Sequence, residues 1–419
     1  MFDVNKIRND FPFLKRNTNS IYFDNSATSL KPQVVIDRIN DYNSYESCSN
    51  HSTDYKLVYD LNKEMEEVRN KVANFINADS REIVFTSGST YSSNLIALSY
   101  GMNNLSKDDV ILTSYIEHAS SVLPWFNVSK KTGAKIKYFD FDENIQFDLN
   151  KFKKSFDENK SIKVVVVAET SNVLSYTLPI KDICKVAHEH GAIVVCDCAQ
   201  AAPHLKLDVK DSDVDFIFFS AHKMCGPTGI GILFGKYSLL DKMDPVFYGG
   251  ASNARFDKDM NIILKDTPNK FESGTVNISA ILGFGKAIDY INSLGQENIR
   301  QYENELSKYL FDKLSKLDNI IVYNKLTNNS IVSFNVKNIF AQDVASYLGT
   351  KGIYVRSGNH CAKLLHNLIG TDDTIRASLY FYNTKEEIDR FVEILNDITI
   401  DKVIGTVLWW MRILKEAYY

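Results

Sequence analysis

A cysteine lies directly after a histidine in the stretch "VRSGNHCAK", where His360 and Cys361 follow the glycine at position 358. A thiol in such a stretch could serve as a nucleophile, as a metal ligand or as a buried apolar side chain. Gly358 and its polar neighbours predict an exposed loop. Exposure favours the nucleophile, because a thiolate must be accessible to attack a substrate.

Further polar residues follow a series of short apolar runs that we interpret as strands. They are Ser89 with Thr90, His118, Asn172, Asp197 with Gln200, and the group of Ser220, His222 and Lys223. Each group by itself is accounted for by a helix cap, a turn or a surface position. Ligands of open parallel sheets bind at the carboxyl ends of the strands, and we therefore expect these side chains to share one site.

These side chains match the requirements of pyridoxal phosphate. The cofactor needs a lysine for an imine bond and an acidic partner for its pyridine nitrogen, which Lys223 and Asp197 offer. The hydroxyls and backbone N–H groups at the helix start of Ser89 and Thr90 suit its phosphate. His118 supplies a flat group for the face of the ring. The sequence therefore predicts a pyridoxal phosphate enzyme.

Several motifs extend this prediction to a family. The segment "FFSAHKMCGPTGIGILFG" around Lys223 resembles the cofactor-lysine segment of class V aminotransferase-fold enzymes. More closely, the chain resembles group II cysteine desulfurases, which are related to selenocysteine lyases. The resemblance runs from "YFDNSATSLKP" to "RASLYFYNT", and "ETSNVLS", "VVCDCAQA", "SAHK", "FESGTVN" and "RSGNHCA" occur between them in the family's order. It implies the pyridoxal phosphate-dependent transferase fold, which is aspartate aminotransferase-like.

The resemblance implies a role for each matching residue around the cofactor. Lys223 would hold the cofactor as an imine and then move protons, and Asp197 would pair with the pyridinium. His118 would stack on the ring and assist proton transfer, and Gln200 would donate a hydrogen bond to the phenolic oxygen. The phosphate would be bound by Ser89, Thr90, Ser220 and His222. Thr275 would reach the phosphate bound by the other subunit, which implies a homodimer.

The resemblance also implies the substrate and the reaction. Arg376 would bind the carboxylate of L-cysteine in a bidentate fork, helped by Asn172, which would also contact the cofactor. Cys361 as a thiolate would attack the substrate sulfur, and L-alanine would leave. The persulfide on Cys361 would pass to an acceptor protein, a scaffold or a shuttle, for the assembly of iron–sulfur clusters or another sulfur-containing product. We expect His360 or the loop backbone to lower the pKa of the thiol.

Several positions depart from the family pattern. Asn359 replaces a histidine, Cys198 replaces a small residue, Tyr91 replaces an acidic residue, and Cys225 replaces a large or aromatic residue. The segment "ESCSNHSTDYKLVYD" lacks the usual Arg-Gly turn. These differences are compatible with a specialised desulfurase and with a weakened enzyme.

Cys196 and Cys198 flank Asp197 and point to the opposite side of their strand. Their spacing is not that of common zinc sites, and we interpret both thiols as buried apolar side chains.

The elements that would position these residues alternate between strands and helices. We predict strands at 83–86, 110–113, 135–139, 164–168, 193–196, 216–219 and 230–234, with helices between most of them. The run "VVVVA" at 164–168 is typical of a strand that is buried on both faces. The alternation predicts an α/β fold with a mainly parallel, doubly wound sheet. Helical spacing of Leu61, Met65, Val68 and Val72 predicts an early amphipathic helix.

The pattern changes towards the C-terminus. Long helices are predicted around 278–317, followed by short strands at 331–335, 353–356 and 375–380 and by a helix that the capping box at Thr384 opens. We therefore expect a large cofactor-binding domain over 20–285 and a smaller α+β domain over 286–400 that includes 1–19. An apolar C-terminal helix over 401–419, with Trp409 and Trp410, would pack on the body or on a partner subunit.

Composition narrows the class of protein. Among 419 residues, 44% are hydrophobic and 24% are charged, and the net charge of −4 argues against a nucleic-acid partner. The six cysteines are scattered along a long chain, which predicts a reducing cytoplasm rather than a disulfide framework. We find no signal peptide or membrane span, and we expect no membrane partner.

Alternatives remain open at this stage. The nearest are a selenocysteine lyase and another class V lyase or transaminase. A catalytically inactive scaffold that binds a sulfur carrier is a third, although Lys223, Asp197, His118 and Arg376 argue against it. The fourth is a metal site of His360, Cys361 and His366, which lacks a second ligand pair at zinc-site spacing, and we expect no metal.

Overall fold

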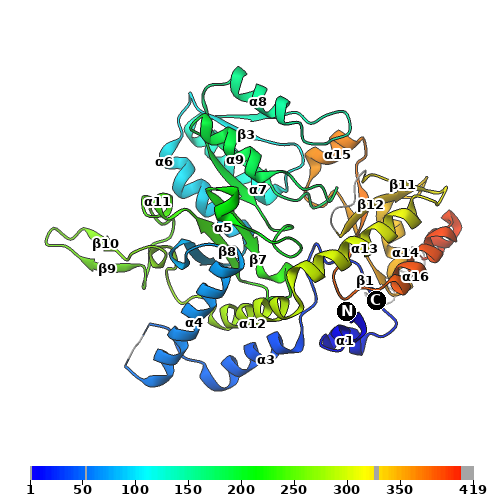
Figure 1. The fold of residues 1–419 in the computed structure, drawn as a ribbon, viewed down its shortest axis with the longest axis horizontal. Coiled ribbons are helices and arrows are strands. Elements are labelled where there is room, and N and C mark those ends of the chain that lie inside the picture. The colour runs from blue at the N-terminus through cyan, green and yellow to red at the C-terminus, as the bar shows by residue number, and fades with distance from the viewer. Residues whose placement is uncertain (1, 52–53, 325–329, 407–419) are drawn as a thin grey trace, which may run out of the picture. The chain divides into compact units, whose positions relative to one another are not determined.

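The computed structural model describes residues 2–51, 54–324 and 330–406 (Figure 1). The chain divides into two compact units. The large unit comprises Lys31–Thr170 and Leu178–Ser293, and the small unit comprises the chain before and after them together with the loop Ser171–Thr177. The helix predicted over 401–419 falls mostly on 407–419, outside the described residues, as do Trp409 and Trp410. No helix in the described ranges is long and apolar enough to cross a membrane.

A seven-stranded sheet forms the centre of the large unit. Its strands are β2 (Ile83–Thr86), β3 (Val110–Thr113), β4 (Lys135–Tyr138), β5 (Ile162–Ala168), β6 (Ile193–Asp197), β7 (Phe216–Ser220) and β8 (Gly231–Gly235), in the order β2-β8-β7-β6-β5-β3-β4. All neighbours pair in parallel except β8, which is antiparallel to β2 and to β7. The mainly parallel α/β sheet is confirmed.

Helices surround this sheet because its strands, except β4, are apolar on both faces. In β5, six of seven residues are buried, as the "VVVVA" run predicts. The helices of the large unit are α3 (Gln33–Asp41), α4 (Lys56–Phe75), α5 (Ser89–Ile96), α6 (Met102–Asn104), α7 (Ala119–Thr132), α8 (Leu149–Glu158), α9 (Ile180–Glu189), α10 (Val209–Ser212), α11 (Tyr237–Leu240) and α12 (Ile278–Leu294). The hairpin of β9 (Asn253–Phe256) and β10 (Ile262–Leu264) extends from this unit (Figure 1).

The small unit is built on an antiparallel sheet. Its strands are β11 (Ile320–Val322), β12 (Ile331–Val336), β15 (Thr374–Ser378) and β14 (Arg356–Gly358), in that order, and β1 (Ile21–Tyr22) pairs separately with β13 (Ile353–Tyr354). The helices are α1 (Val4–Arg8), α2 (Pro12–Arg16), α13 (Gln296–Leu314), α14 (Ala341–Thr350), α15 (Lys363–Ile369) and α16 (Lys385–Asn396). The predicted capping box opens α16, where the Thr384 hydroxyl accepts from the Glu387 N–H.

The strand predicted over 353–356 is two strands, because the chain leaves β1 after Tyr354 and joins β15 at Arg356. The loop Ser171–Thr177 also joins this unit through side chains. Ser333 Oγ donates to the Val173 carbonyl at 2.6 Å, and Asn324 Nδ2 donates to the Leu174 carbonyl at 2.7 Å. Through these bonds the loop, including Asn172, is part of the small unit.

Candidate active site

Lys223 closes a short 3-10 turn, Ala221–Lys223, directly after β7. The turn is tight, since a Cβ added at Gly226 would lie 2.8 Å from the Ala221 side chain and 2.9 Å from its carbonyl. Lys223 is close enough to Asp197 for its charge to lower the pKa of that carboxyl. The large unit therefore brings together the predicted cofactor lysine and the predicted acidic partner.

Asp197 ends β6 and is buried. Burial raises the pKa of the Asp197 carboxyl, while the Ala199 N–H, which donates to Oδ1 at 2.9 Å, and the Lys223 charge act against that shift. A buried carboxylate held by these two groups is suited to pair with a ligand cation, because a ligand charge would replace the lost solvation.

Glu117 is a buried carboxyl to which the sequence prediction assigned no role. Burial and the neighbouring Asp197 raise its pKa to about 8, and Ser114 Oγ donates to Oε1 at 2.6 Å. Near neutral pH this group is thus mostly protonated. A glutamate that directly precedes the predicted ring-stacking histidine was the available signal.

His118 is the N-cap residue of α7, in a half-buried position. Its Nδ1 accepts the backbone N–H of Ser120 at 3.1 Å, so that in the neutral ring the proton is on Nε2. The helix start thereby fixes the tautomer and the orientation of the imidazole.

The predicted phosphate side chains gather at the start of α5. Ser220 Oγ accepts the Ser89 N–H at 2.8 Å and donates to Ser89 Oγ at 2.9 Å, and Thr90 Oγ1 donates to Ser120 Oγ at 2.9 Å. The turn before the helix packs tightly on β8, where a Cβ at Gly231 would lie 2.5 Å from Gly88 Cα. Hydroxyls and backbone N–H groups at a helix start are an anion-binding arrangement.

His222 lies beside a lysine that sequence reasoning did not single out. Lys31 Nζ donates to the His222 carbonyl at 3.0 Å, and burial lowers the pKa of Lys31 to about 8. Burial, Lys223 and Lys31 lower the pKa of His222 to about 4, so that its ring is neutral near pH 7. Lys31 stands in the quoted motif "YFDNSATSLKP", which was the signal that could have found it.

Gln200 and Thr275 are the remaining predicted cofactor residues of the large unit. Gln200 is buried three positions after Asp197. The Thr275 hydroxyl is 3.1 Å from His51 Nε2, and Thr275 lines a cavity of about 220 Å³ together with Thr86 and Ser87. The described contacts do not join Thr275 to Ser89 or Ser220.

The small unit contains the predicted substrate residues. Arg376 is buried on β15, and Asp24 Oδ1, at 3.3 Å from Nη2, acts against the burial that lowers the arginine pKa to about 10. Arg376 Nη1 donates to the Asn172 carbonyl at 3.0 Å, and Asn172 Nδ2 donates to the His360 carbonyl at 2.8 Å. Arg376 Nε and Asn172 Oδ1 are buried and have no hydrogen-bond partner within the described ranges. Asp24, from "YFDNSATSLKP", is a further residue without a role in the sequence prediction.

Cys361 is exposed, as the loop prediction requires. His360 and Cys361 both have left-handed backbones, with φ of 50° and 58°, and the Cys361 N–H donates to Asn359 Oδ1 at 3.1 Å. Because two consecutive residues other than glycine rarely adopt this conformation, the loop has a defined shape that turns the thiol outward and His360 inward.

The expected role of His360 at the thiol is wrong. Its Nε2 contacts the Thr374 hydroxyl at 3.0 Å, and burial, together with the nearby Arg376, lowers its pKa to about 2. A neutral, inward-facing ring places no cation beside Cys361. Arg376 is the cation near the thiol, since Cys361 raises the pKa of that arginine.

The alternative of a metal site at His360, Cys361 and His366 is also not supported. Both histidines contact the Thr374 hydroxyl, and the thiol is exposed. Within residues 2–51, 54–324 and 330–406, three ligating atoms converge at a different place, at Glu169, Cys196 and Cys198.

Comparison with known proteins agrees with this inventory. The family model for aminotransferase class-V matches residues 21–391. The chain is 43% identical over 397 residues to the "Probable cysteine desulfurase" of Synechocystis sp., covering 93% of this chain and 94% of the relative. It is 36% identical over 413 residues to the "Cysteine desulfurase" of Haloferax volcanii, covering 94% and 96%. A solved structure of a cysteine desulfurase from Thermococcus onnurineus superposes with a TM-score of 0.89 at 34% identity, covering 94% of this chain and 97% of that one.

Proposed function

The chain belongs to the aminotransferase class-V family, and on that premise we propose that it is a pyridoxal phosphate-dependent cysteine desulfurase. It converts L-cysteine to L-alanine and retains the sulfur as a persulfide on Cys361. The names of the relatives support this activity. The observation that carries it is the combination of an exposed thiol, Cys361, with a buried arginine, Arg376, in one unit.

The residues of the large unit fit pyridoxal phosphate. When bound, this cofactor supplies an electron sink for bonds at the substrate carbon. Lys223 would hold it through Nζ and move protons at that atom, and the buried Asp197 carboxylate would pair with the pyridine nitrogen. Ser89, Thr90, Ser220 and His222 would bind the phosphate. His118 would lie against the ring, and Gln200 would donate to the phenolic oxygen.

The residues of the small unit fit an amino-acid carboxylate. The Arg376 guanidinium is desolvated, and its Nε is a buried donor without a hydrogen-bond partner in the described chain. A carboxylate that approaches such a group gains charge-assisted hydrogen bonds in a medium of low polarity. Asn172, whose amide bonds lead to His360 and Arg376, orients the same region.

Cys361 accepts the sulfur. Its thiolate attacks the sulfur of L-cysteine, so that a sulfur–sulfur bond forms while the carbon–sulfur bond of the substrate breaks. The electron pair of the broken bond remains with the carbon skeleton, which gains a proton and leaves as alanine. Two thiols thus become one alanine and one persulfide, and no external oxidant or reductant is needed.

The finer parts of the proposal concern partners and place. We propose a homodimer in which Thr275 reaches the phosphate bound by the other subunit, because this threonine stands in the "FESGTVN" motif and lines a cavity. The persulfide on exposed Cys361 passes to an acceptor protein, a scaffold or a shuttle for iron–sulfur cluster assembly. The six free cysteines favour a reducing cytoplasm.

The test of this function is the product profile of Cys361→Ala. The unmodified protein should form alanine and sulfide from L-cysteine plus a reductant, and Cys361→Ala should form neither. The variant should still show the change in cofactor absorbance on adding L-cysteine, because Arg376 and Lys223 are intact. Cys48→Ala, which removes a half-buried thiol, is the matched control and should retain activity. Full activity of Cys361→Ala would exclude the persulfide reaction.

A further inference from the structure

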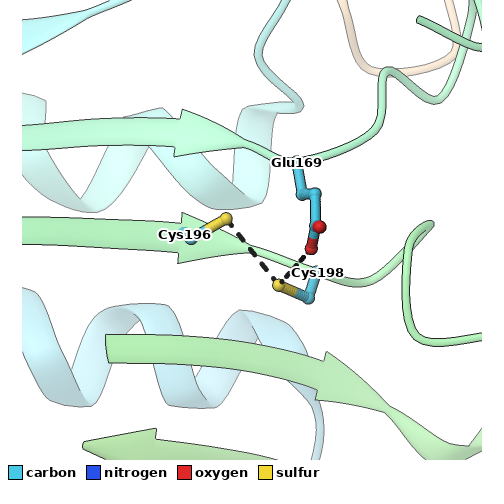
Figure 2. A group of neighbouring side chains, drawn as sticks. All are labelled: Glu169, Cys196 and Cys198. Atoms are coloured by element: carbon cyan, nitrogen blue, oxygen red, sulfur yellow. Dashed lines mark hydrogen bonds between the residues drawn. The ribbon is translucent and has the colours of Figure 1, made fainter. Parts of the chain in front are cut away.

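Two thiols and a carboxylate converge on the side of β6 that faces away from Asp197 (Figure 2). Cys196 lies in β6, Cys198 follows its end, and Glu169 follows the end of β5. The parallel pairing of β5 and β6 sets Ala168 opposite Asp197, which brings Glu169 to Cys198. The desulfurase reaction uses none of these three side chains.

Two of the three distances within this trio are close to those of a coordination shell, and the third, between Cys196 and Glu169, is at most 4.8 Å. The two Sγ atoms are 3.7 Å apart, and Cys198 Sγ is 3.2 Å from Glu169 Oε2. With zinc–sulfur bonds of about 2.3 Å, the sulfur–sulfur edge of a tetrahedron is about 3.8 Å. With a zinc–oxygen bond of about 2.1 Å, the sulfur–oxygen edge is about 3.6 Å, so that the carboxylate needs to shift by a few tenths of an ångström.

Both thiols of the trio are buried, and the Glu169 carboxylate accepts the Cys198 S–H. A divalent cation that replaces the two thiol protons would neutralise two of the three negative charges of two thiolates and one carboxylate.

A cavity of about 200 Å³ reaches the three ligands. Its lining includes Glu169, Cys196 and Cys198 together with the surface lysines Lys181 and Lys206. The cavity supplies a route for an ion and room for a water molecule as a fourth ligand. Asp208 and Asp211 also line the cavity, and Asp211 pairs with Lys181 at 2.6 Å, so that the lining outside the trio carries no net charge.

We propose that Glu169, Cys196 and Cys198 bind a thiophilic divalent cation of the zinc class, with water as the fourth ligand. The two thiol protons pass to solvent on binding, and the ion is not reduced or oxidised. Because β6 carries both Cys196 and Asp197, the ion braces the strand that holds the predicted cofactor partner. The site is independent of the proposed desulfurase activity, and its test does not depend on turnover.

The test is a titration of the cofactor-loaded protein with Co²⁺, which reports tetrahedral thiolate coordination through absorption bands at the red end of the visible spectrum. Cys361→Ser is used as the parent, so that the exposed thiol does not compete, and a phosphine keeps the cysteines reduced. We expect one equivalent of Co²⁺ to give these bands and Zn²⁺ to remove them. A parent protein that gives no tetrahedral bands would overturn the proposal.

Three further variants in this parent locate the ion. Cys198→Ala should lower Co²⁺ affinity at least 100-fold, and Glu169→Gln about 10-fold, because loss of an outer-shell partner alone typically costs 10–100-fold. Cys184→Ala is the matched control. This buried cysteine on α9 is outside the trio, and its replacement should leave the bands unchanged. If Cys198→Ala does not fold, the Co²⁺ affinity of Glu169→Gln tests the proposal, because that substitution keeps the shape of the side chain. Unchanged affinity in that variant would also overturn the proposal.

Discussion

The large unit presents its predicted functional groups from the ends of sheet strands, whereas the small unit presents its thiol from a loop. Asp197 and Ser220 end β6 and β7, and Lys223 follows in a turn that backbone contacts constrain. Cys361 stands in an exposed loop with a left-handed backbone. The difference matches the two tasks: a cofactor needs fixed charges, while a thiol that collects sulfur must remain accessible to an acceptor.

The two units also bury groups of opposite charge type. In the large unit, burial raises the pKa values of the carboxyls Glu117, Asp197 and Glu169. In the small unit, burial lowers the pKa values of His360 and Arg376. In both units burial favours the neutral form of these groups over the charged form that water favours. The stability of the large unit should therefore fall as pH rises, and the stability of the small unit should fall as pH falls.

The largest effect should come from Lys223→Ala in the large unit. We expect a loss of activity on the order of 10³-fold, because a positioned proton-transfer group alone contributes about 10²–10⁴-fold. Cofactor absorbance and alanine formation measure the result. Lys242→Ala, at an exposed lysine of the same unit, should leave both unchanged. Retained turnover in Lys223→Ala would remove the basis for assigning the cofactor to strand-end residues.

The second effect concerns alkaline stability of the large unit. The folded pKa of Glu117 is about 8, above its ordinary value of 4.5, so that its contribution to stability is complete below about pH 4.5 and is lost as pH rises through 8. Between pH 5 and 8 the cofactor-free protein should lose roughly 3–5 kcal/mol through this group. Glu117→Gln should make the free energy of unfolding depend less on pH. Urea unfolding, combined with hydrogen exchange of large-unit peptides, measures this dependence. An equal slope in the variant would show that Glu117 is charged in the folded protein.

The third effect concerns substrate binding by the small unit. Arg376→Lys should raise the KM for L-cysteine about 10–100-fold, because it removes charge-assisted hydrogen bonds that are worth roughly 1.5–3 kcal/mol. Steady-state kinetics measure KM and kcat separately. Arg390→Lys, at an exposed arginine that bonds only to the Asn19 and Lys351 carbonyls among the described contacts, should leave KM unchanged. A decrease in kcat at constant KM would place Arg376 outside the carboxylate site.

The smallest effect is the acid response of the small unit. The folded pKa of His360 is about 2, below its ordinary value of 6.5, so that its contribution to stability is present above about pH 6.5 and is lost as pH falls. From pH 7 to pH 5 this group should cost about 2 kcal/mol of stability. At pH 7, His360→Gln should be less stable than the unmodified protein, but its stability should change less with pH, as hydrogen exchange of small-unit peptides measures. Part of the pH dependence should remain, because the pKa of His366 is also lowered. His51→Gln, at an exposed site, serves as control. A steeper slope in His360→Gln would contradict the burial of a neutral ring.

Much of the large unit could be predicted because its signals are local. The run "VVVVA" indicates a strand with two buried faces, and β5 includes all of it. Lys223 and Asp197 follow apolar runs, so that the rule for parallel sheets predicts both at the same edge of the sheet. The capping box at Thr384 is likewise complete within four residues.

Other features could not be predicted because they depend on contacts between distant segments. The inward turn of His360 is stabilised by Thr374, and Asp24 reaches Arg376 from the other end of the chain. Loop Ser171–Thr177 joins the small unit through Ser333 and Asn324. None of these pairings has a fixed spacing that a sequence pattern could reveal.

The sequence by itself determined the mainly parallel sheet, the family, and the residue types available for a lysine-bound cofactor and a sulfur-accepting thiol. The spacing of hydrophobic residues and the capping residues of helices are local patterns, and they can be identified without the fold. Only the tertiary structure decided which charges are desolvated and which side chains meet. The neutral state of His360, the protonated state of Glu117 and the convergence of Glu169 on two thiols all follow from burial and strand register, which are set by the whole chain.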